Sequence, residues 1–262
     1  MGDGMSAARI VLTCGHECPD PEYLRRLDTD WTVVAGGREL SEAVEAAQAS
    51  SPAPICVVPM TVGRDPGLVA DAARALSWSR RKTNSAPVVL ARQIGETDHL
   101  VGWLRGRAVS ASTDTPSADA LVIAAPSGDP FEDAELFRIA RLVRQFGPIG
   151  LVEVALSGGD PDLDGAVDRC RRLGARKPIV LSAWFGTSRV AGRHDVVDGG
   201  PLLSDAALRG LVASRVSDAL HGLVHGRDGV DDGMDAEHGH GFAHSHGPGE
   251  EHGHGHGHGH GH

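Results

Sequence analysis

Histidine is concentrated in the last part of this chain, where it could bind metal ions. Ten of the fifteen histidines lie between His238 and His262, and histidine alternates with glycine from His252 onward. A neutral imidazole offers a lone pair to zinc, copper, nickel or cobalt ions, and glycine spacers let several rings surround one ion. The candidate ligands are His238, His240, His244, His246, His252, His254, His256, His258, His260 and His262. We predict that residues 228–262 form a metal-collecting tail.

The composition of residues 228–262 also predicts disorder. The segment has no hydrophobic periodicity, and it contains seven Asp or Glu residues and no Lys or Arg. Such a segment cannot bury enough apolar surface to offset the entropy of ordering. Two other interpretations stay open, namely a purification tag and a solubilising tail. Tags are usually contiguous histidines, whereas Phe242, Ser245 and Pro248 interrupt the histidines here.

A second candidate metal ligand, His16, lies near the beginning of the chain in the sequence Cys-Gly-His-Glu-Cys at 14–18. This sequence directly follows an apolar segment that predicts a buried strand, and open α/β sheets bind ligands at the carboxyl ends of their strands. A loop histidine with ordinary hydrogen bonds and a structural zinc site with Cys14 and Cys18 are the alternatives. Zinc is less favoured, because no fourth ligand is close and Cys14 should point into the sheet. We predict that His16 binds metal transiently.

The elements that position these residues follow an alternating pattern of strands and helices. Short apolar runs predict strands buried on both faces of a parallel sheet. They are Arg9–Cys14, Trp31–Ala35, Ile55–Met60, Val88–Ala91, Ala120–Ala125, Leu151–Leu156 and Pro178–Ala183. Amphipathic patterns predict helices at Glu39–Gln48, Leu68–Ser77, Phe131–Gln145, Leu163–Leu173 and Asp205–His221. This alternation predicts an α/β fold with doubly wound parallel sheets.

The chain also repeats itself, which predicts two similar halves. The sequence VVPMTVGR at 57–64 aligns with VLSAWFGT at 180–187, and IVLTCGH near the start aligns with LVIAAPS in the middle. We predict an N-terminal half at 1–109, a linker rich in Ser and Thr at 110–118 and a C-terminal half at 119–227. The two halves should face a central cleft at the carboxyl ends of their strands.

The amino-acid composition argues against several classes of binding partner for this protein. The net charge is −10, but without the seven acidic residues of the tail the body has 28 acidic and 25 basic residues. This balance and the lack of a basic stripe argue against nucleic acid as a partner. There is no apolar run long enough for a membrane span, no basic leader before an apolar stretch, and no phosphate-binding loop. With four cysteines and no leader, we expect a cytoplasmic protein with reduced thiols.

The motifs together resemble a known family. The stretch 121–189, with LVIAAPSGDPFEDAELFRIARLV followed by LVEVALSGGDPDLDGAVDRCRRLGARKPIVLSAWFGTSR, is similar to CbiX-type sirohydrochlorin chelatases. The resemblance covers both halves, roughly residues 9–221. It implies a class II chelatase, an enzyme that inserts cobalt or iron into sirohydrochlorin on the way to cobalamin or sirohaem. A His-rich stretch is an accessory of some members.

The resemblance also implies roles for individual residues. His16 matches the catalytic histidine that follows the first strand in the family, and Glu153 matches the acidic residue of its VEVAF-type strand. The family's second histidine follows a V-V-P strand, and Arg64 stands in that place here. The corresponding loop of the second half, 125–129, contains no histidine.

If the resemblance holds, His16 would supply the metal ion and Glu153 or Glu17 would accept the pyrrolic protons. Arg64, Arg189 and Arg193 would bind the carboxylates of the macrocycle. The partners would be a sirohydrochlorin-type tetrapyrrole and a divalent metal as substrate, Co²⁺ or Fe²⁺ with Ni²⁺ as a third candidate, and no cofactor would be permanently bound. The missing second histidine favours the alternative, a non-catalytic cobalt or nickel metallochaperone or storage protein. A degenerate chelatase that only binds tetrapyrrole is a further alternative.

Overall fold

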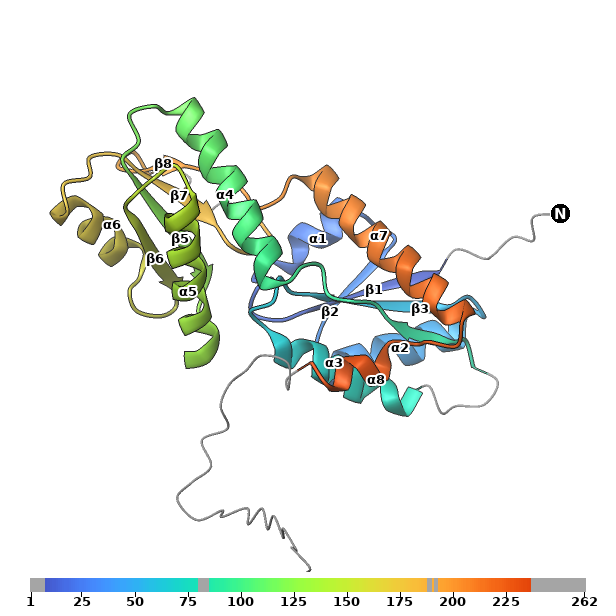
Figure 1. Cartoon of the computed structure of the whole chain (residues 1–262). Helices are drawn as coiled ribbons and strands as arrows, with labels where there is room; N and C mark the ends of the chain where they lie inside the picture. The colour runs from blue at the N-terminus through green and yellow to red at the C-terminus, as the bar shows by residue number, and fades with distance from the viewer. Residues whose placement is uncertain (1–7, 80–84, 188–189, 191–192, 237–262) are drawn as a thin grey trace, which may run out of the picture.

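The protein contains two parallel sheets with helices packed around them (Figure 1). The computed structural model describes residues 8–79, 85–187, 190 and 193–236. The strands are β1 (Arg9–Cys14), β2 (Trp31–Ala35), β3 (Ile55–Met60), β4 (Val88–Leu90), β5 (Ala120–Pro126), β6 (Val152–Ser157), β7 (Pro178–Ser182) and β8 (Val197–Asp198). The helices are α1 (Pro21–Leu27), α2 (Arg38–Ser50), α3 (Pro66–Ser79), α4 (Thr97–Asp114), α5 (Pro130–Phe146), α6 (Leu163–Arg172), α7 (Asp205–Val224) and α8 (Val230–Met234).

The two sheets have the same topology, which confirms the predicted repeat. The strand order is β2-β1-β3-β4 in the first sheet and β6-β5-β7-β8 in the second, and every pairing is parallel. The central strands β1, β3, β5 and β7 are buried almost throughout, because helices cover both faces of each sheet. The predicted α/β class and its two parallel-sheet halves are therefore present.

Two helices, α4 and α7, pack against the half to which the sequence analysis did not assign them. Helix α4 packs against α5 and β7 of the second sheet, whereas α7, from the predicted C-terminal half, packs against β3 and β4 of the first. As a result, one apolar core contains residues of both halves, among them Leu12, Leu104, Ile123 and Val212. No described helix combines the length and the apolar character that crossing a membrane requires.

The predicted linker at 110–118 is largely helical, since α4 continues to Asp114. The buried residues of α4 recur at helical spacing, namely Leu100, Leu104, Ala108 and Ala111. The apolar face of this helix therefore extends into the Ser- and Thr-rich stretch. The hydroxyls do not break this helix, because three of them donate to carbonyl oxygens four residues earlier: Ser110 to Gly106, Ser112 to Ala108 and Thr113 to Val109. The halves are thus joined by a helix rather than by a loop.

The segment 228–236, predicted to belong to the disordered tail, is folded onto the first half. The amide of Leu90 in β4 donates to the carbonyl of Asp228 over 2.8 Å, and α8 packs against α3. Val230 is fully buried. An ordered tail segment was not predicted, because a single buried valine and closely packed glycines carry no periodic signal.

Gly233 allows the close packing of α8, and its replacement should detach this helix. A Cβ atom at this position would lie 2.5 Å from Leu90 Cδ2 and 3.0 Å from Ala73 Cβ. We expect Gly233→Ala to lower the free energy of unfolding by about 1–3 kcal/mol, the usual effect of overpacking. Gly210→Ala is the matched control, because this helical glycine has no atom within 4 Å of such a Cβ. Denaturant unfolding should show a gain of about 0.5–1 kcal/mol for the control, and equal effects would contradict the packing argument.

Candidate metal site

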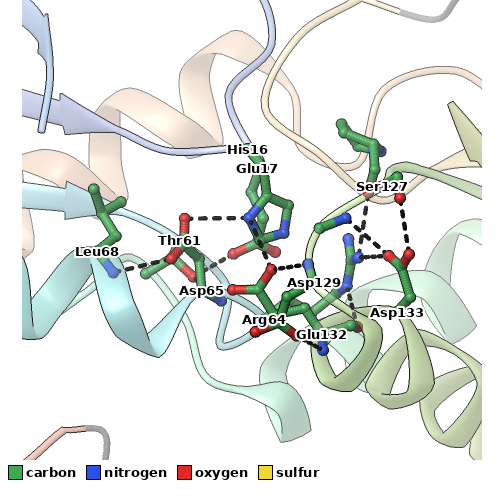
Figure 2. A network of polar contacts seen from close by, with 12 residues as sticks. His16, Glu17, Thr61, Arg64, Asp65, Leu68, Ser127, Asp129, Glu132 and Asp133 are labelled. Atoms are coloured by element: carbon green, nitrogen blue, oxygen red, sulfur yellow. Dashed lines mark hydrogen bonds and ion pairs between the residues drawn. The ribbon is translucent and has the colours of Figure 1, made fainter. Parts of the chain in front are cut away.

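Three side chains that can bind a metal ion meet between the two halves: His16, Asp65 and Glu132. They lie just beyond the carboxyl ends of β1, β3 and β5. One ligand atom from each residue lies within 4.8 Å of the others. Figure 2 shows the three side chains pointing toward one another. His16 and Asp65 come from the first half and Glu132 from the second, so the cluster exists only when the halves are packed together.

The histidine is oriented by the two carboxylates and keeps one nitrogen unoccupied. Its Nδ1 lies 3.3 Å from Asp65 Oδ2 and 3.6 Å from Glu132 Oε2. Its Nε2 is buried and has no hydrogen-bond partner among the residues that the structure describes. A buried imidazole nitrogen without a partner is unusual, because such atoms nearly always find one. The nitrogen that faces both carboxylates is Nδ1, so an ion held by all three residues would bind this nitrogen.

Helix capping fixes the positions of both carboxylates. Asp65 Oδ1 accepts from the amide of Leu68 in the first turn of α3, and the other oxygen faces the imidazole. Glu132 forms a capping box with Asp129 at the start of α5, and its Oε2 accepts from the Asp129 amide over 2.7 Å. Each carboxylate is therefore held by a backbone N–H before any ion binds, which reduces the entropy lost on binding.

Two glycines make room for these carboxylates. A Cβ atom at Gly15 would lie 1.9 Å from Asp65 Oδ2, and one at Gly128 would lie 2.1 Å from Glu132 Oε2. Any other residue would force the carboxylates away from the histidine. Gly15 directly follows β1, and Gly128 lies two residues after the end of β5.

The three groups shift one another's pKa values. Burial acts to lower the pKa of His16, but the hydrogen bond with Asp65 and the negative charges of Glu17, Asp65 and Glu132 outweigh it, so this pKa is raised. Burial opposes ionisation of Asp65, yet the hydrogen bond and charge of His16 hold its pKa below the usual range. Burial raises the pKa of Glu132. Without metal, the neighbouring carboxylates therefore favour the protonated form of His16.

This balance predicts a pH effect on the metal-free protein. Because the folded pKa of His16 is raised, its interaction with Asp65 stabilises the protein fully below the unfolded pKa of 6.5, and this stabilisation is lost as pH rises through the folded value. Asp65→Asn keeps a helix cap but removes the charge, so it should lower the His16 pKa and reduce stability more at pH 6 than at pH 8. NMR titration of the imidazole and unfolding at both pH values test this. A His16 pKa unchanged in the variant would contradict it.

A buried polar network lies behind the cluster and joins the halves. Glu17 is fully buried, and its Oε2 accepts hydrogen bonds from the Thr61 hydroxyl and from the Val62 amide. Its other oxygen has no partner within the described part of the chain, and burial raises the pKa of Glu17. Arg64 is also fully buried and extends from the first half into the second (Figure 2). It donates to carbonyl oxygens of Pro126 and Glu132 and lies 3.5 Å from a carboxylate oxygen of Asp133.

A cavity of about 250 Å³ adjoins the cluster between the two halves. Gly63, Pro66 and Thr97 line it from the first half, and Glu132, Glu135 and Arg138 line it from α5 of the second. Glu132 belongs both to the cluster and to the cavity wall. The cavity therefore gives a molecule in the cleft access to the edge of the metal site.

The structure does not bring together all the residues predicted from the sequence. Glu153 lies near the amino end of β6, opposite Val122, and its carboxylate is 3.6 Å from Arg169. Four residues of strand, about 13 Å, separate it from the carboxyl end of the sheet, where His16 lies. Glu153 therefore lies apart from the cluster that contains His16.

Two of the three predicted substrate-binding arginines, Arg64 and Arg193, already have partners in the protein. Arg64 is occupied by the second half, as described above. Arg193 forms ion pairs with Asp164 over 2.5 Å and Asp195 over 2.8 Å, so two carboxylates already neutralise it. Arg189 and the ten candidate histidines between His238 and His262 lie outside the described residues. The thiols of Cys14 and Cys18 are buried and contact each other, which does not favour a zinc site that includes His16.

Asp65 and Glu132 are the site residues that sequence reasoning missed. Both carry a recognisable local signal. Asp65 precedes Pro66 at the start of a predicted helix, and Glu132 completes a capping pattern with Asp129 in Asp-Pro-Phe-Glu. Such signals predict helix starts, and they indicate a metal site only when the topology places two of them beside one histidine.

Comparisons with known proteins agree with this architecture. No family model matches the sequence. The chain is 24% identical over 198 residues to the sirohydrochlorin cobaltochelatase of Priestia megaterium, which is 68% of this chain and 65% of that protein. The chain thus spans less than two thirds of the length of this relative. The resemblance to sirohydrochlorin chelatases inferred from the motifs is confirmed.

The fold is also similar to a solved structure of this kind. SirB from Bacillus subtilis with Fe³⁺ superposes with a TM-score of 0.52 at 14% identity, over 81% of this chain and 95% of that chain. The sirohydrochlorin chelatase SirB from Bacillus subtilis subspecies spizizenii in complex with cobalt gives a TM-score of 0.48 at 13% identity, over the same shares. At this identity, the first superposition confirms the predicted fold class.

Proposed function

We propose that this chain, which resembles sirohydrochlorin chelatases in sequence and fold, inserts a divalent metal ion, cobalt or iron, into sirohydrochlorin or a closely related tetrapyrrole. The observation that carries the proposal is the cluster of His16, Asp65 and Glu132 beside a cavity between the halves. A catalytic residue predicted from the family, His16, lies in the cluster, and Asp65, which directly follows Arg64 at the place of the family's second histidine, supplies one of the two carboxylates.

The cluster has the charge and ligand types for a divalent ion that must later leave. One neutral imidazole and two carboxylates neutralise an M²⁺ ion, and nitrogen and oxygen ligands suit cobalt and iron in the divalent state. Three protein ligands leave positions open for the substrate. The metal can therefore exchange protein ligands for pyrrolic nitrogens one at a time, without passing through the fully hydrated ion.

Proton transfer accompanies the exchange. Insertion of M²⁺ releases two pyrrolic N–H protons, so the ring keeps its overall charge. Glu132 is placed to accept a proton, because it lines the cavity and its raised pKa makes it a stronger base than an ordinary carboxylate. This role replaces the one predicted for Glu153. The cavity of about 250 Å³ is smaller than most ligand pockets, so it would enclose only the ring edge that faces the metal.

An assay with the full chain tests the proposal. Purified protein is mixed with sirohydrochlorin and Co²⁺ or Fe²⁺ without oxygen, and the absorption change of the macrocycle is followed. Insertion should be much faster than the spontaneous reaction. A rate equal to the spontaneous rate would reject the enzyme. If metal is bound but not inserted, the alternative of a metallochaperone or storage protein is correct.

A further inference from the structure

Two cysteine side chains contact each other at the base of the loop that carries His16. Cys14 is the last residue of β1, and Cys18 lies three residues before α1. Their sulfur atoms are 3.0 Å apart, and both side chains are buried in the main apolar core. Neither the metal cluster nor the adjoining cavity includes these thiols. The pair is therefore available for chemistry that the proposed function does not use.

The backbone of the loop brings the two sulfur atoms together. The Cys18 amide donates to the Gly15 carbonyl over 3.1 Å, which closes a tight turn. The sulfur–sulfur bond of a disulfide is about 2.05 Å long, so the two atoms need to approach each other by only about 1 Å. A small contraction of the loop supplies this approach.

The other two cysteines have no sulfur neighbour among the described residues. Cys56 lies in β3 and belongs to the main apolar core, and Cys170 lies on α6 in a separate core. All four thiols are buried and reduced in the structure. Only one pair can therefore be oxidised to a disulfide within the folded chain.

The loop between the two cysteines is fixed at Glu17 and touches the metal cluster at Gly15. The Glu17 carboxylate accepts from the first half, as described above, and its backbone carbonyl accepts from the Phe185 amide of the second half over 2.9 Å. Gly15 lies directly against the Asp65 carboxylate. Contraction of the loop is therefore taken up at Gly15 and His16. It moves the imidazole relative to the two carboxylates, which helix caps hold in place.

We propose that Cys14 and Cys18 form a reversible disulfide that weakens metal binding at the cluster, so that the reduced chain holds metal and the oxidised chain releases it. The disulfide itself requires no tetrapyrrole chemistry, whereas its effect on the metal rests on the cluster that carries the proposed function. The oxidant is a hydroperoxide, of which hydrogen peroxide is the simplest. Because both thiols are buried, they react when the loop opens locally, so oxidation is slower than that of an exposed thiol.

The reaction with hydrogen peroxide takes two steps. One cysteine sulfur attacks a peroxide oxygen, the O–O bond breaks, and a sulfenic acid and one water molecule form. The other sulfur attacks the sulfenic sulfur, the S–O bond breaks, and a second water molecule leaves. The two thiols thus lose two electrons and two protons, which reduce the peroxide to water. A dithiol reductant reverses the reaction by thiol–disulfide exchange.

Peptide mapping of the full chain tests the disulfide without any assay of activity. The reduced, metal-free protein is treated with hydrogen peroxide, alkylated in denaturant and cleaved with trypsin. Residues 10–25 form one tryptic peptide that contains both cysteines. It should lose both alkylation sites and two hydrogen atoms, and dithiothreitol should restore both. The variants C14A and C18A should not form this crosslink, whereas C56A, a matched change in the same core, should form it like the wild type.

A Zn²⁺ titration tests the effect on the cluster, because zinc has no redox chemistry of its own. The difference between the wild type and H16A isolates the cluster from the other histidines of the chain. Oxidation should lower the affinity obtained from this difference by about tenfold, the lower end of the usual effect of disturbing the support of a ligand. Dithiothreitol should restore the affinity. In C14A/C18A, the affinity should be the same before and after peroxide.

Two results would overturn the proposal. One is a folded chain whose 10–25 peptide keeps both alkylated thiols under conditions in which peroxide crosslinks the same peptide in the unfolded chain. The other is a disulfide that leaves the Zn²⁺ affinity of the cluster unchanged. A chain that binds Zn²⁺ in a redox-dependent way but does not insert metal would reject the proposed function and leave the disulfide switch standing.

Discussion

Replacing His16 with alanine should reduce metal insertion to the spontaneous rate. His16 is the nitrogen ligand of the cluster, and the two carboxylates alone would hold a hydrated ion weakly. Loss of a direct ligand should exceed the 10- to 100-fold effect typical of groups that only support a ligand, so we expect a decrease of at least about 100-fold. The metal-dependent absorption change of sirohydrochlorin measures it, together with Co²⁺ affinity by titration.

His221→Ala is the control for this experiment, because His221 is an exposed residue of α7 that contacts His225 and lies outside the cluster. It should retain wild-type insertion. The carboxylates allow a sharper comparison on one helix. Glu132→Ala should slow insertion strongly, whereas Glu135→Ala, which alters the same cavity wall but not the cluster, should have a small effect. Wild-type rates for the His16 variant would mean that the metal is transferred elsewhere.

The sequence predicted the strands well, because each is a short apolar run with buried neighbours on both faces. It predicted the connections between the halves poorly. Helix α4 was not predicted, since its apolar residues are few and its end is rich in Ser and Thr. The packing of α7 on the first sheet is determined by tertiary contacts rather than by local sequence. Helix α7 is amphipathic along one face, and nothing local specifies which of two similar sheets that face covers.

At the candidate site too, some residues can be predicted from the local sequence, whereas others depend on tertiary contacts. His16 was found because a histidine directly after a buried strand must lie at the carboxyl edge of the sheet. Glu153 was chosen by resemblance to a motif, and the strand register places it at the opposite end. Glu132 becomes a ligand only through the contact between halves. Glu132 is 116 positions from His16 and 67 from Asp65 in the sequence, and no periodicity connects them.

Arg64 connects the two halves beside the candidate metal site. Its guanidinium holds the carbonyl of Glu132 and the carboxylate of Asp133, so it fixes the first turn of α5 against the first half. Asp133 in turn accepts from the Ser127 hydroxyl and the Gly128 amide of the preceding loop. Arg64, which was predicted to bind substrate, therefore positions Glu132 of the candidate metal site.

Replacing Arg64 with methionine should consequently produce the largest loss of stability among the site variants. The substitution keeps an apolar stem of similar length but leaves Asp133, a mostly buried carboxylate, without its cation. Breaking such a pair from one side destabilises proteins by about 3–5 kcal/mol, and we expect a loss near the lower figure because Asp133 keeps two hydrogen bonds. Denaturant unfolding measures this loss.

Two further variants separate the charge effect from simple packing. Arg138→Met removes an exposed arginine of the same cavity, whose ion pair with Glu135 lies on one helix, so it should change stability by less than about 1 kcal/mol. The double variant R64M/D133N removes both charges of the buried pair and should recover part of the lost stability, because no uncompensated charge remains. If R64M alone unfolds like the wild type, Arg64 does not hold the halves together, and Glu132 must reach His16 for another reason.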